Sequence, residues 1–297
     1  MNIEKEIKLR LSLLDDDDDE VRNYVKKSII KLGLKTIPYL EKFFFEIHNE
    51  KLLQDIEQII TEIKFKEIEK LLLKWYKTDN KDLIFALWII SLINDFYIEW
   101  KIINDSVNQI VKDTWLKFKN NYTPIQKIET LNYTMFKEKK FETKIKSDNI
   151  KLPFSYFLPN LLKTKEGNPF SMVPFYIAVA QRLKLNIFGV LLPNFPIACL
   201  VSEEFLYENN FENLHEYVIF YIDVNNKGNF ISKNDLSYVL NHYKLNDIQN
   251  FLNPVSNRTL LMHYIYKVIN IFLYNNIIEK ANFFKKLIKK INSTCNF

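Results

Sequence analysis

A chain of 297 residues with 47% hydrophobic and 26% charged residues has enough apolar side chains to bury a core, which excludes an intrinsically disordered chain. Its formal net charge of +5 is spread along the chain without an arginine-rich block, a weaker signal than a dedicated nucleic-acid-binding protein carries. No apolar stretch reaches about 18 residues, and the segment MNIEKEIKLRLSLLDDDDDE lacks the apolar core of a signal peptide, so we expect a soluble, cytoplasmic protein.

Residues 3–118 are predicted to be almost wholly helical, because apolar residues recur at spacings of three and four with polar residues between them. A first helix follows the acidic turn from Asp15 to Asp19 and ends at Gly33, and a second helix has Pro38 in its first turn. The residues expected to face inward are Val21, Val25, Ile29, Ile37, Leu40, Phe44 and Ile47. This pair resembles a HEAT-type repeat, and further helices are predicted near 51–63, 65–77 and 81–93.

The five consecutive aspartates suggest a calcium-binding loop, but the spacing does not support one. An EF-hand loop that began at Asp15 would need glycine at its sixth position and glutamate at its twelfth, where this chain has Glu20 and Lys26. Carboxylates beside a helix N-terminus are favoured by the helix dipole. We therefore interpret the aspartates as the start of a helix.

The middle and end of the chain are predicted to combine helices with a small sheet. In chain order, the predicted elements are a short helix beginning near Thr123 and Pro124, a helix from Pro169 to about Leu183, strands at 187–192, 197–201 and 217–223, a helix from near Ser232, and two helices from about Ser256 to the end. Short connections between the strands predict one antiparallel sheet that packs on the helix beginning at Pro169. The last two helices are expected to form a hairpin.

Two segments of this region carry a family resemblance. EGNPFSMVPFYIAVAQRLKLNIFGVLLPNF is similar to a glycine-rich helix start followed by a "YGVNLP" strand, and VIFYIDVNNKGNFISKNDL is similar to an "IDPFNGG"-like or "INPFNKG"-like strand and turn. In this order they resemble SirB-type transglutaminase-like proteins. The resemblance implies a predominantly α, α+β protein with a HEAT-like helical-repeat domain at residues 1–120, a transglutaminase-like (papain-like) core at 121–255 and a tetratricopeptide-like helical tail at 256–297.

Active members of that family use a Cys at the helix start, a His on the next strand and an Asp or Asn on the strand after it. A thiol at a helix N-terminus has a lowered pKa, the imidazole moves the proton, and the carboxylate orients the imidazole. Carried onto this chain, the Cys position is Pro169 and the His position is Asn194 or Phe195. Only the third position, Asp223, keeps a residue type that can act in the triad. The resemblance therefore implies a degenerate triad of Pro169, Phe195 and Asp223.

Ser171 is the hydroxyl nearest the lost nucleophile, and it leaves one catalytic alternative open. A triad of Ser171, His215 and Asp223 would need the histidine to activate the serine, which is a weak nucleophile at its free pKa. The same residues have a structural interpretation: Asn168 is a favourable N-cap, Pro169 a favoured first helical residue, and Ser171 a partner for a free N–H in the first turn.

No metal site or cofactor is expected. The segment DVNNKGNFISKN places Lys227 at the fifth position of a would-be calcium loop and Asn234 at the twelfth, and a predicted strand precedes it. The cysteines, Cys199 and Cys295, form neither a close pair nor a metal-spaced set, which fits a reducing compartment. The basic amphipathic segment 280–291 is expected to pack in the helical tail rather than lie on a membrane.

These observations favour a non-catalytic interaction or scaffold protein whose partner is a protein. Two alternatives remain: a hydrolase or acyltransferase that uses Ser171 and Asp223 with a displaced histidine, and a helical-repeat adaptor that binds through residues 3–118. An exposed apolar patch on the repeats would favour the adaptor.

Overall fold

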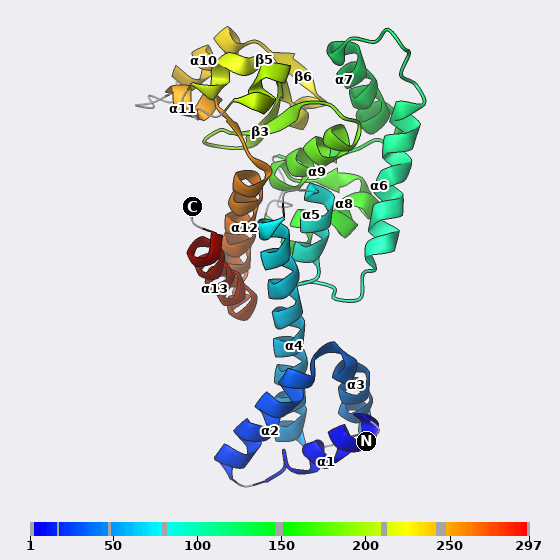
Figure 1. Cartoon of the computed structure of the whole chain (residues 1–297), viewed down its shortest axis with the longest axis vertical. Helices are drawn as coiled ribbons and strands as arrows, with labels where there is room; N and C mark the ends of the chain where they lie inside the picture. Colours follow the sequence, from blue (N-terminus) through cyan, green and yellow to red (C-terminus); the bar gives the residue numbers. More distant parts are fainter. Residues whose placement is uncertain are drawn as a thin grey trace. The chain divides into compact units, whose positions relative to one another are not determined.

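The computed structural model describes residues 3–16, 18–46, 49–78, 82–145, 151–208, 213–241 and 248–295 (Figure 1). It divides into two compact units, Met1–Leu73 and Lys74–Phe297, and the boundary falls within helix α4 (Glu50–Lys77). The domain limits near 120 and 255 that the sequence suggests divide the chain differently and stay a prediction.

The first unit is built from short helices around a small apolar core. Besides α4, its elements are α1 (Ile3–Ser12), α2 (Asp19–Leu32), the 3-10 helix η1 (Gly33–Thr36) and α3 (Ile37–Glu46). Gly33 ends α2 with φ 73°, as predicted, and buried side chains on the inner faces include Ile7, Val25, Ile29, Leu40, Ile56 and Ile59. Phe44 is half-buried, and Ile47 lies outside the described residues.

One helical prediction in this region was wrong. The segments 51–63 and 65–77 were expected to be separate helices, but they form the single helix α4. The reason is local, because α4 contains neither glycine nor proline. Lys64, Phe65 and Lys66 are ordinary helical residues and do not interrupt the backbone hydrogen bonds.

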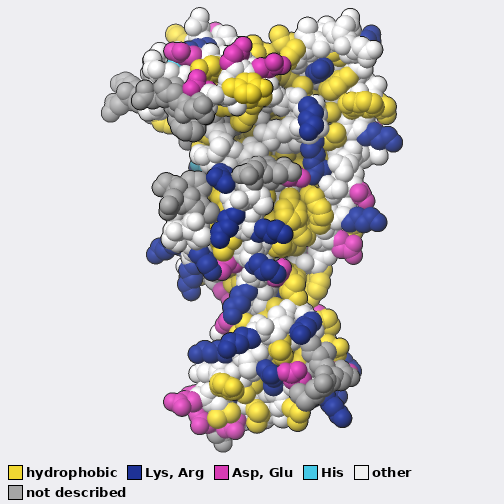
Figure 2. All heavy atoms as spheres, in the orientation of Figure 1, with side chains coloured by type: hydrophobic (Ala, Val, Ile, Leu, Met, Phe, Trp, Pro, Cys, Tyr) yellow, Lys and Arg dark blue, Asp and Glu magenta, His cyan; other side chains and the backbone are white. Residues whose placement is uncertain are grey.

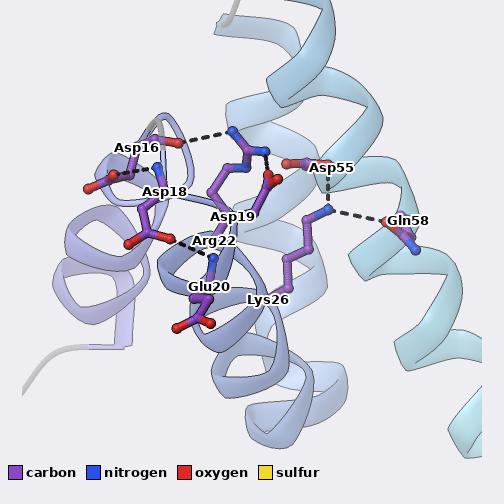
Figure 3. A network of polar contacts seen from close by, with 8 residues as sticks. All are labelled: Asp16, Asp18, Asp19, Glu20, Arg22, Lys26, Asp55 and Gln58. Carbon is purple, nitrogen blue, oxygen red and sulfur yellow. Dashed lines mark hydrogen bonds and ion pairs between the residues drawn. The ribbon is translucent and has the colours of Figure 1, made fainter.

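The acidic turn before α2 forms a network of hydrogen bonds and ion pairs (Figure 3). Asp18 is the N-cap of α2 and accepts a hydrogen bond from the backbone N–H of Glu20 at 2.8 Å. Arg22 pairs with Asp19 and also donates to the carbonyl oxygen of Asp16. Lys26 reaches from α2 to Asp55 on α4, with 2.5 Å between Nζ and Oδ1. These carboxylates therefore cap a helix and pair with cations.

The second unit contains the sheet and the helices around it. Before the first long strand its elements are α5 (Leu83–Ser91), α6 (Trp100–Trp115), α7 (Pro124–Asn132), the π-helix η2 (Tyr133–Glu138), β1 (Glu142–Thr143), η4 (Pro153–Tyr156), α8 (Leu158–Thr164), β2 (Glu166–Gly167) and α9 (Pro169–Arg182). Helix α9 begins at Pro169 as predicted, and its residues from Pro169 to Ala180 are buried. It is the central helix of this unit.

Five strands form an antiparallel sheet in the order β6-β5-β4-β3-β7, which confirms the predicted arrangement. They are β3 (Ile187–Leu191), β4 (Pro196–Val201), β5 (Val218–Asp223), β6 (Asn229–Ile231) and β7 (Pro254–Val255). Helix α9 contacts β3 and β4 on one face. The helices α10 (Lys233–Asn241) and α11 (Ile248–Leu252) lie on the other face. Leu236 and Leu240 of α10 pack there in a cluster with Ile197, Cys199 and Tyr221 of the strands.

The chain ends in the predicted helical pair, α12 (Asn257–Tyr274) and α13 (Ile278–Cys295), with Ser256 as the N-cap of α12. The basic segment 280–291 belongs to α13, and its buried residues are Ala281, Phe283, Phe284, Leu287, Ile288 and Ile291. None of the described helices combines the length and the apolar character needed to cross a membrane. On the face drawn in Figure 2, lysine and arginine side chains stand among acidic and hydrophobic ones in both units.

Candidate functional site

The start of α9 is a closed hydrogen-bonded cap. Asn168 Oδ1 accepts from the backbone N–H groups of Phe170 and Ser171 at 2.9 and 3.1 Å. In return, Ser171 Oγ accepts from the backbone N–H of Asn168 at 3.1 Å, which completes a capping box. Pro169 occupies the first turn, where its missing N–H costs nothing. The free N–H groups of the first turn thus already have partners.

Ser171 is part of the protein interior. Its side chain is 2% exposed, and its Oγ lies 3.0 Å from the carbonyl oxygen of Ser155 and 3.1 Å from that of Asn168. Gly167 allows this close packing, because a Cβ there would lie 2.8 Å from Ser171 Oγ and 2.9 Å from Leu161 Cδ1. The hydroxyl therefore bonds to the backbone on the buried side of the helix start.

Aromatic side chains gather around Phe170, directly after Pro169. The ring of Phe195 lies 6.0 Å from that of Phe170, and Tyr156 stacks on it at 6.1 Å. The imidazole of His263, on α12, lies 5.9 Å away, and Lys267 Nζ stands 4.8 Å from the ring centroid. The fold thus places Phe195, at the predicted histidine position, beside the helix start that carries the predicted cysteine position.

Asp223 ends β5 and lines a cavity of about 340 Å³ together with Phe195 and Asn194. Its Oδ1 accepts from the backbone N–H of Asn225 at 3.1 Å. Burial raises the pKa of the Asp223 carboxyl above its usual range, against the opposing effect of hydrogen bonds from Asn226 and Asn225. Two positions of the predicted triad, Phe195 and Asp223, therefore share one cavity.

His215 occupies a different environment. It lies in the 3-10 helix η6 (Leu214–Tyr217), is 5% exposed, and its Nδ1 is 3.1 Å from Asn253 Oδ1. Among the hydrogen bonds of the described residues, none joins any two of Ser171, His215 and Asp223. The histidine beside the helix start is His263, which no local sequence pattern indicates because only the packing of α12 brings it there.

In the described part of the chain, no group of three or more His, Cys, Asp and Glu side chains is placed to hold a metal ion. The turn after β5 has Lys227 and Gly228 at positive φ, and the Asp223 carboxylate accepts from the backbone of that turn. Its geometry is that of a strand-to-strand connection.

A family model described as the transglutaminase-like superfamily matches residues 101–265, more than half of the chain. The chain belongs to the transglutaminase-like superfamily. The matched region contains α9, all five strands of the sheet and the first half of α12. No curated protein and no solved structure matches the chain.

Cys199 of the transglutaminase-like domain is expected to be unreactive. It lies on β4, is fully buried in the cluster under α10, and burial raises the pKa of its thiol. Since the thiolate is the reactive form, iodoacetamide near neutral pH should spare it. The measurement uses a Cys295→Ser variant, with labelling in denaturant as the control for a competent thiol. Rapid, stoichiometric labelling of the folded variant would contradict the prediction. The side chain of Cys295 lies outside the described residues, and its labelling at the rate of an unstructured peptide stays a prediction.

His263 is expected to stay neutral well below pH 6. Burial, and secondarily the charge of Lys267, lowers its pKa to about 4, against about 6.5 for a free histidine. The unfolded chain then binds the proton first, so the stability present above about pH 6.5 is lost as the pH falls towards 4, by at most about 1.4 kcal/mol per pH unit. NMR titration of the His263 ring, assigned with a His263→Gln variant, should give a midpoint near pH 4. A midpoint near 6.5 would refute the prediction.

Proposed function

We propose that this transglutaminase-like protein is non-catalytic and acts as an interaction or scaffold protein in the cytoplasm. The observation that carries the proposal is the closed cap at the start of α9. An active site of the papain-like type needs a nucleophile there and N–H groups that stabilise its charge. In this chain Pro169 supplies neither, and the next two N–H groups donate to Asn168 Oδ1.

The other degenerate positions support the same proposal. The side chain of Phe195 can neither accept nor donate a proton, and its ring contacts that of Phe170. Asp223 keeps its carboxyl, but its described hydrogen bonds go to the turn that follows β5 rather than to an imidazole. A carboxylate that orients no histidine has no part in proton transfer of the triad type.

Within the superfamily we place the chain with the SirB-type proteins. The helix pair α2 and α3 in the first unit supports a HEAT-like N-terminal half, and the pair α12 and α13 supports a tetratricopeptide-like tail. Repeats of this kind bury one face between neighbours and leave an extended surface, which is suited to protein partners.

The test of the non-catalytic assignment is chemical labelling. A fluorophosphonate probe should not label Ser171 in the folded protein, because the hydroxyl is buried and bonded to backbone oxygens. Incubation with ester and amide substrates should release no more product than buffer. Labelling at Ser171, located by peptide mass spectrometry and abolished by heat denaturation, would instead support the hydrolase or acyltransferase alternative with Asp223 and a displaced histidine.

Ser171→Ala separates the structural role from a catalytic one. The variant loses the Oγ that accepts from Asn168 N and bonds to Ser155, so the free energy of unfolding should fall by about 0.5–2 kcal/mol. Urea unfolding measures this change. Affinity capture of partners from cytoplasm should be the same for the variant and the unmodified chain. Loss of a biological activity in a fully folded variant would contradict the proposal.

The adaptor alternative, binding through residues 3–118, has one specific observation in its favour. Phe45 on α3 is 83% exposed, and with Phe44 and Ile60 it lines a pocket of about 390 Å³ in the first unit. A large exposed aromatic beside a pocket is typical of an interaction site. Phe45→Ser should then abolish capture of a partner that Tyr274→Ser, at an exposed aromatic on α12, leaves bound. Equal capture by both variants would reject this surface.

A further inference from the structure

The excess of positive charge in this chain lies in its last two helices. Lysines occur throughout the sequence, but their excess over acidic residues does not. Of the 41 Lys and Arg residues, seven lie at 257–297, whereas only one of the 36 Asp and Glu residues, Glu279, lies there. The formal net charge is therefore +6 for this segment and −1 for residues 1–256. The helical pair α12 and α13 is the cationic part of the protein.

Lysines form a cationic surface on α13. Lys285, Lys286 and Lys289 are exposed, and spacings of one, three and four residues make them neighbours on one side of the helix. These three residues are named the lysine triangle. Figure 2 shows dark blue side chains at the left edge of the view, where Figure 1 places α13. Phe284 and Leu287 of the same helix are buried.

No carboxylate in the described part of the chain pairs with the lysine triangle. The ion pairs between described residues include none of its three members. Helix α12, against which α13 packs, contains no Asp or Glu. Glu279 precedes Lys285 by six residues, about 9 Å along the helix axis. Since lysines three and four residues apart repel one another, this arrangement destabilises the isolated helix.

The usual structural reasons for lysines on a helix do not explain the lysine triangle. Cations in the last turn of a helix interact favourably with its dipole, but the last turn of α13 contains no basic residue. Exposed helix faces also gain from Glu–Lys pairs, as on α4, whose six lysines are matched by six acidic residues. On α13, five lysines accompany a single glutamate. An anionic partner would relieve the repulsion between them.

The surroundings of the lysine triangle favour one kind of anionic partner. Single-stranded nucleic acids bind through aromatic side chains that stack on bases as well as through cations, but Phe283 and Phe284 of α13 are both buried. A helix that lies on a membrane inserts its apolar face, whereas Leu287 and Ile288 are buried within the protein. Carboxylates on a protein segment need only the ammonium groups.

We propose that the lysine triangle docks an extended acidic segment of a partner protein. Alternate side chains of an extended segment lie about 6.6 Å apart on one side, close to the rise of about 6 Å between Lys285 and Lys289. One exposed ion pair contributes little, so binding requires several carboxylates and weakens as salt screens them. This inference rests on the proposed interaction role, for which it names a surface and the chemistry of a partner.

Fluorescence anisotropy with the full chain and a labelled, amidated octaglutamate peptide tests the proposal. We expect saturable binding at about 50 mM salt that weakens at least tenfold at about 300 mM, and no binding of octaglutamine. The triple variant Lys285→Gln, Lys286→Gln, Lys289→Gln should bind octaglutamate at least tenfold more weakly, with an unchanged circular dichroism spectrum because the buried face of α13 is intact.

A matched control separates the site from the net charge of the protein. The triple variant Lys112→Gln, Lys119→Gln, Lys137→Gln removes three exposed lysines outside α13 and should bind octaglutamate within twofold of the unmodified chain. Carbodiimide cross-linking, which joins a carboxylate to a lysine amine, then locates the peptide on the unmodified chain. Mass spectrometry should place the new amide bond within the lysine triangle. Replacement of the triangle by three arginines should retain binding and abolish these cross-links.

The proposal is overturned if octaglutamate does not bind, if both glutamine variants bind it equally well, or if the cross-links fall elsewhere. Tighter binding of a thymidine nonanucleotide, which has the same eight charges, or of phosphatidylserine vesicles would overturn it in favour of nucleic acid or membrane. Salt-sensitive self-association that the glutamine triple variant loses would identify a second copy as the occupant. Absent peptide binding without fluorophosphonate labelling of Ser171 would refute this surface and leave the non-catalytic role standing.

Discussion

Replacement of Asn168 by alanine is expected to lower the free energy of unfolding of the second unit by about 2–4 kcal/mol, the sum of a lost helix cap and of buried groups left without partners. Asn168 is fully buried, and its Oδ1 serves the N–H groups of Phe170 and Ser171. Its Nδ2 donates to Ser155 Oγ at 3.0 Å. Alanine removes all three hydrogen bonds where water does not replace them. Urea unfolding monitored by circular dichroism measures the loss.

Thr123 provides a matched control, because it caps α7 with the same kind of capping box on the surface. It accepts from the backbone N–H of Gln126, and its side chain is exposed. Thr123→Ala should cost about 0.5–1 kcal/mol, since water replaces the lost hydrogen bond. If Asn168→Ala costs no more than Thr123→Ala, the buried cap does not hold the start of α9 as described.

Gly228→Ala is the second change with a large expected effect, a loss of about 3 kcal/mol or more. Gly228 has φ 79°, a conformation that costs an L-residue roughly 1–2 kcal/mol. An added Cβ would also lie 2.3 Å from Asn132 Oδ1. Asn132 cannot move freely, because its Nδ2 donates to the Gly228 carbonyl oxygen and its Oδ1 accepts from the Tyr176 hydroxyl at 2.7 Å. The clash therefore adds a further cost of about 1–3 kcal/mol.

Two comparisons separate the backbone strain of Gly228→Ala from the clash of the added Cβ with Asn132. Gly33 has a similar φ, 73°, with ψ −157°, a backbone region that is essentially confined to glycine, and no atom lies within 4 Å of an added Cβ; Gly33→Ala should therefore cost only the backbone term, about 1–3 kcal/mol. In an Asn132→Ala background, Gly228→Ala should cost less than in the unmodified chain, because the clashing side chain is absent. Additive effects of the two substitutions would show that the contact between Asn132 and Gly228 is not the source of the cost.

Both large effects concern the surroundings of α9 rather than any reacting atom. Asn168 closes its start, and Tyr176 on α9 is tied through Asn132 to the turn after β5. Such buried polar contacts fix the helix relative to the sheet independently of catalysis. This is consistent with the proposal that the fold persists although Pro169 and Phe195 stand at the predicted Cys and His positions.

Much of the architecture of this protein follows from local sequence signals. Asn168 and Pro169 specify a helix start through a side-chain cap and a fixed φ, and Ser256 does the same for α12. The strands β3, β4 and β5 are mostly apolar runs. The short connection at 192–195 explains why β3 and β4 pair antiparallel, whereas the long connection at 202–217 leaves the pairing of β4 with β5 to the tertiary structure. The wrong prediction of two helices at 51–63 and 65–77 concerns α4. This segment is a continuous run of helix-forming residues without a residue that would break the helix.

By itself, the sequence determined most of the helices and the three longer strands. Through the family resemblance it also suggested that Pro169 and Phe195 stand at the Cys and His positions and that Asp223 is retained. Only the tertiary structure decided which side chains surround those positions. His263 reaches Phe170 because α12 packs on α9, and the cavity exists because α10 covers the face of the sheet where Asp223 ends β5. Helix caps and strands depend on residues that are close together in the chain, so they can be recognised in the sequence. Contacts and cavities depend on packing between distant segments, which no local pattern encodes.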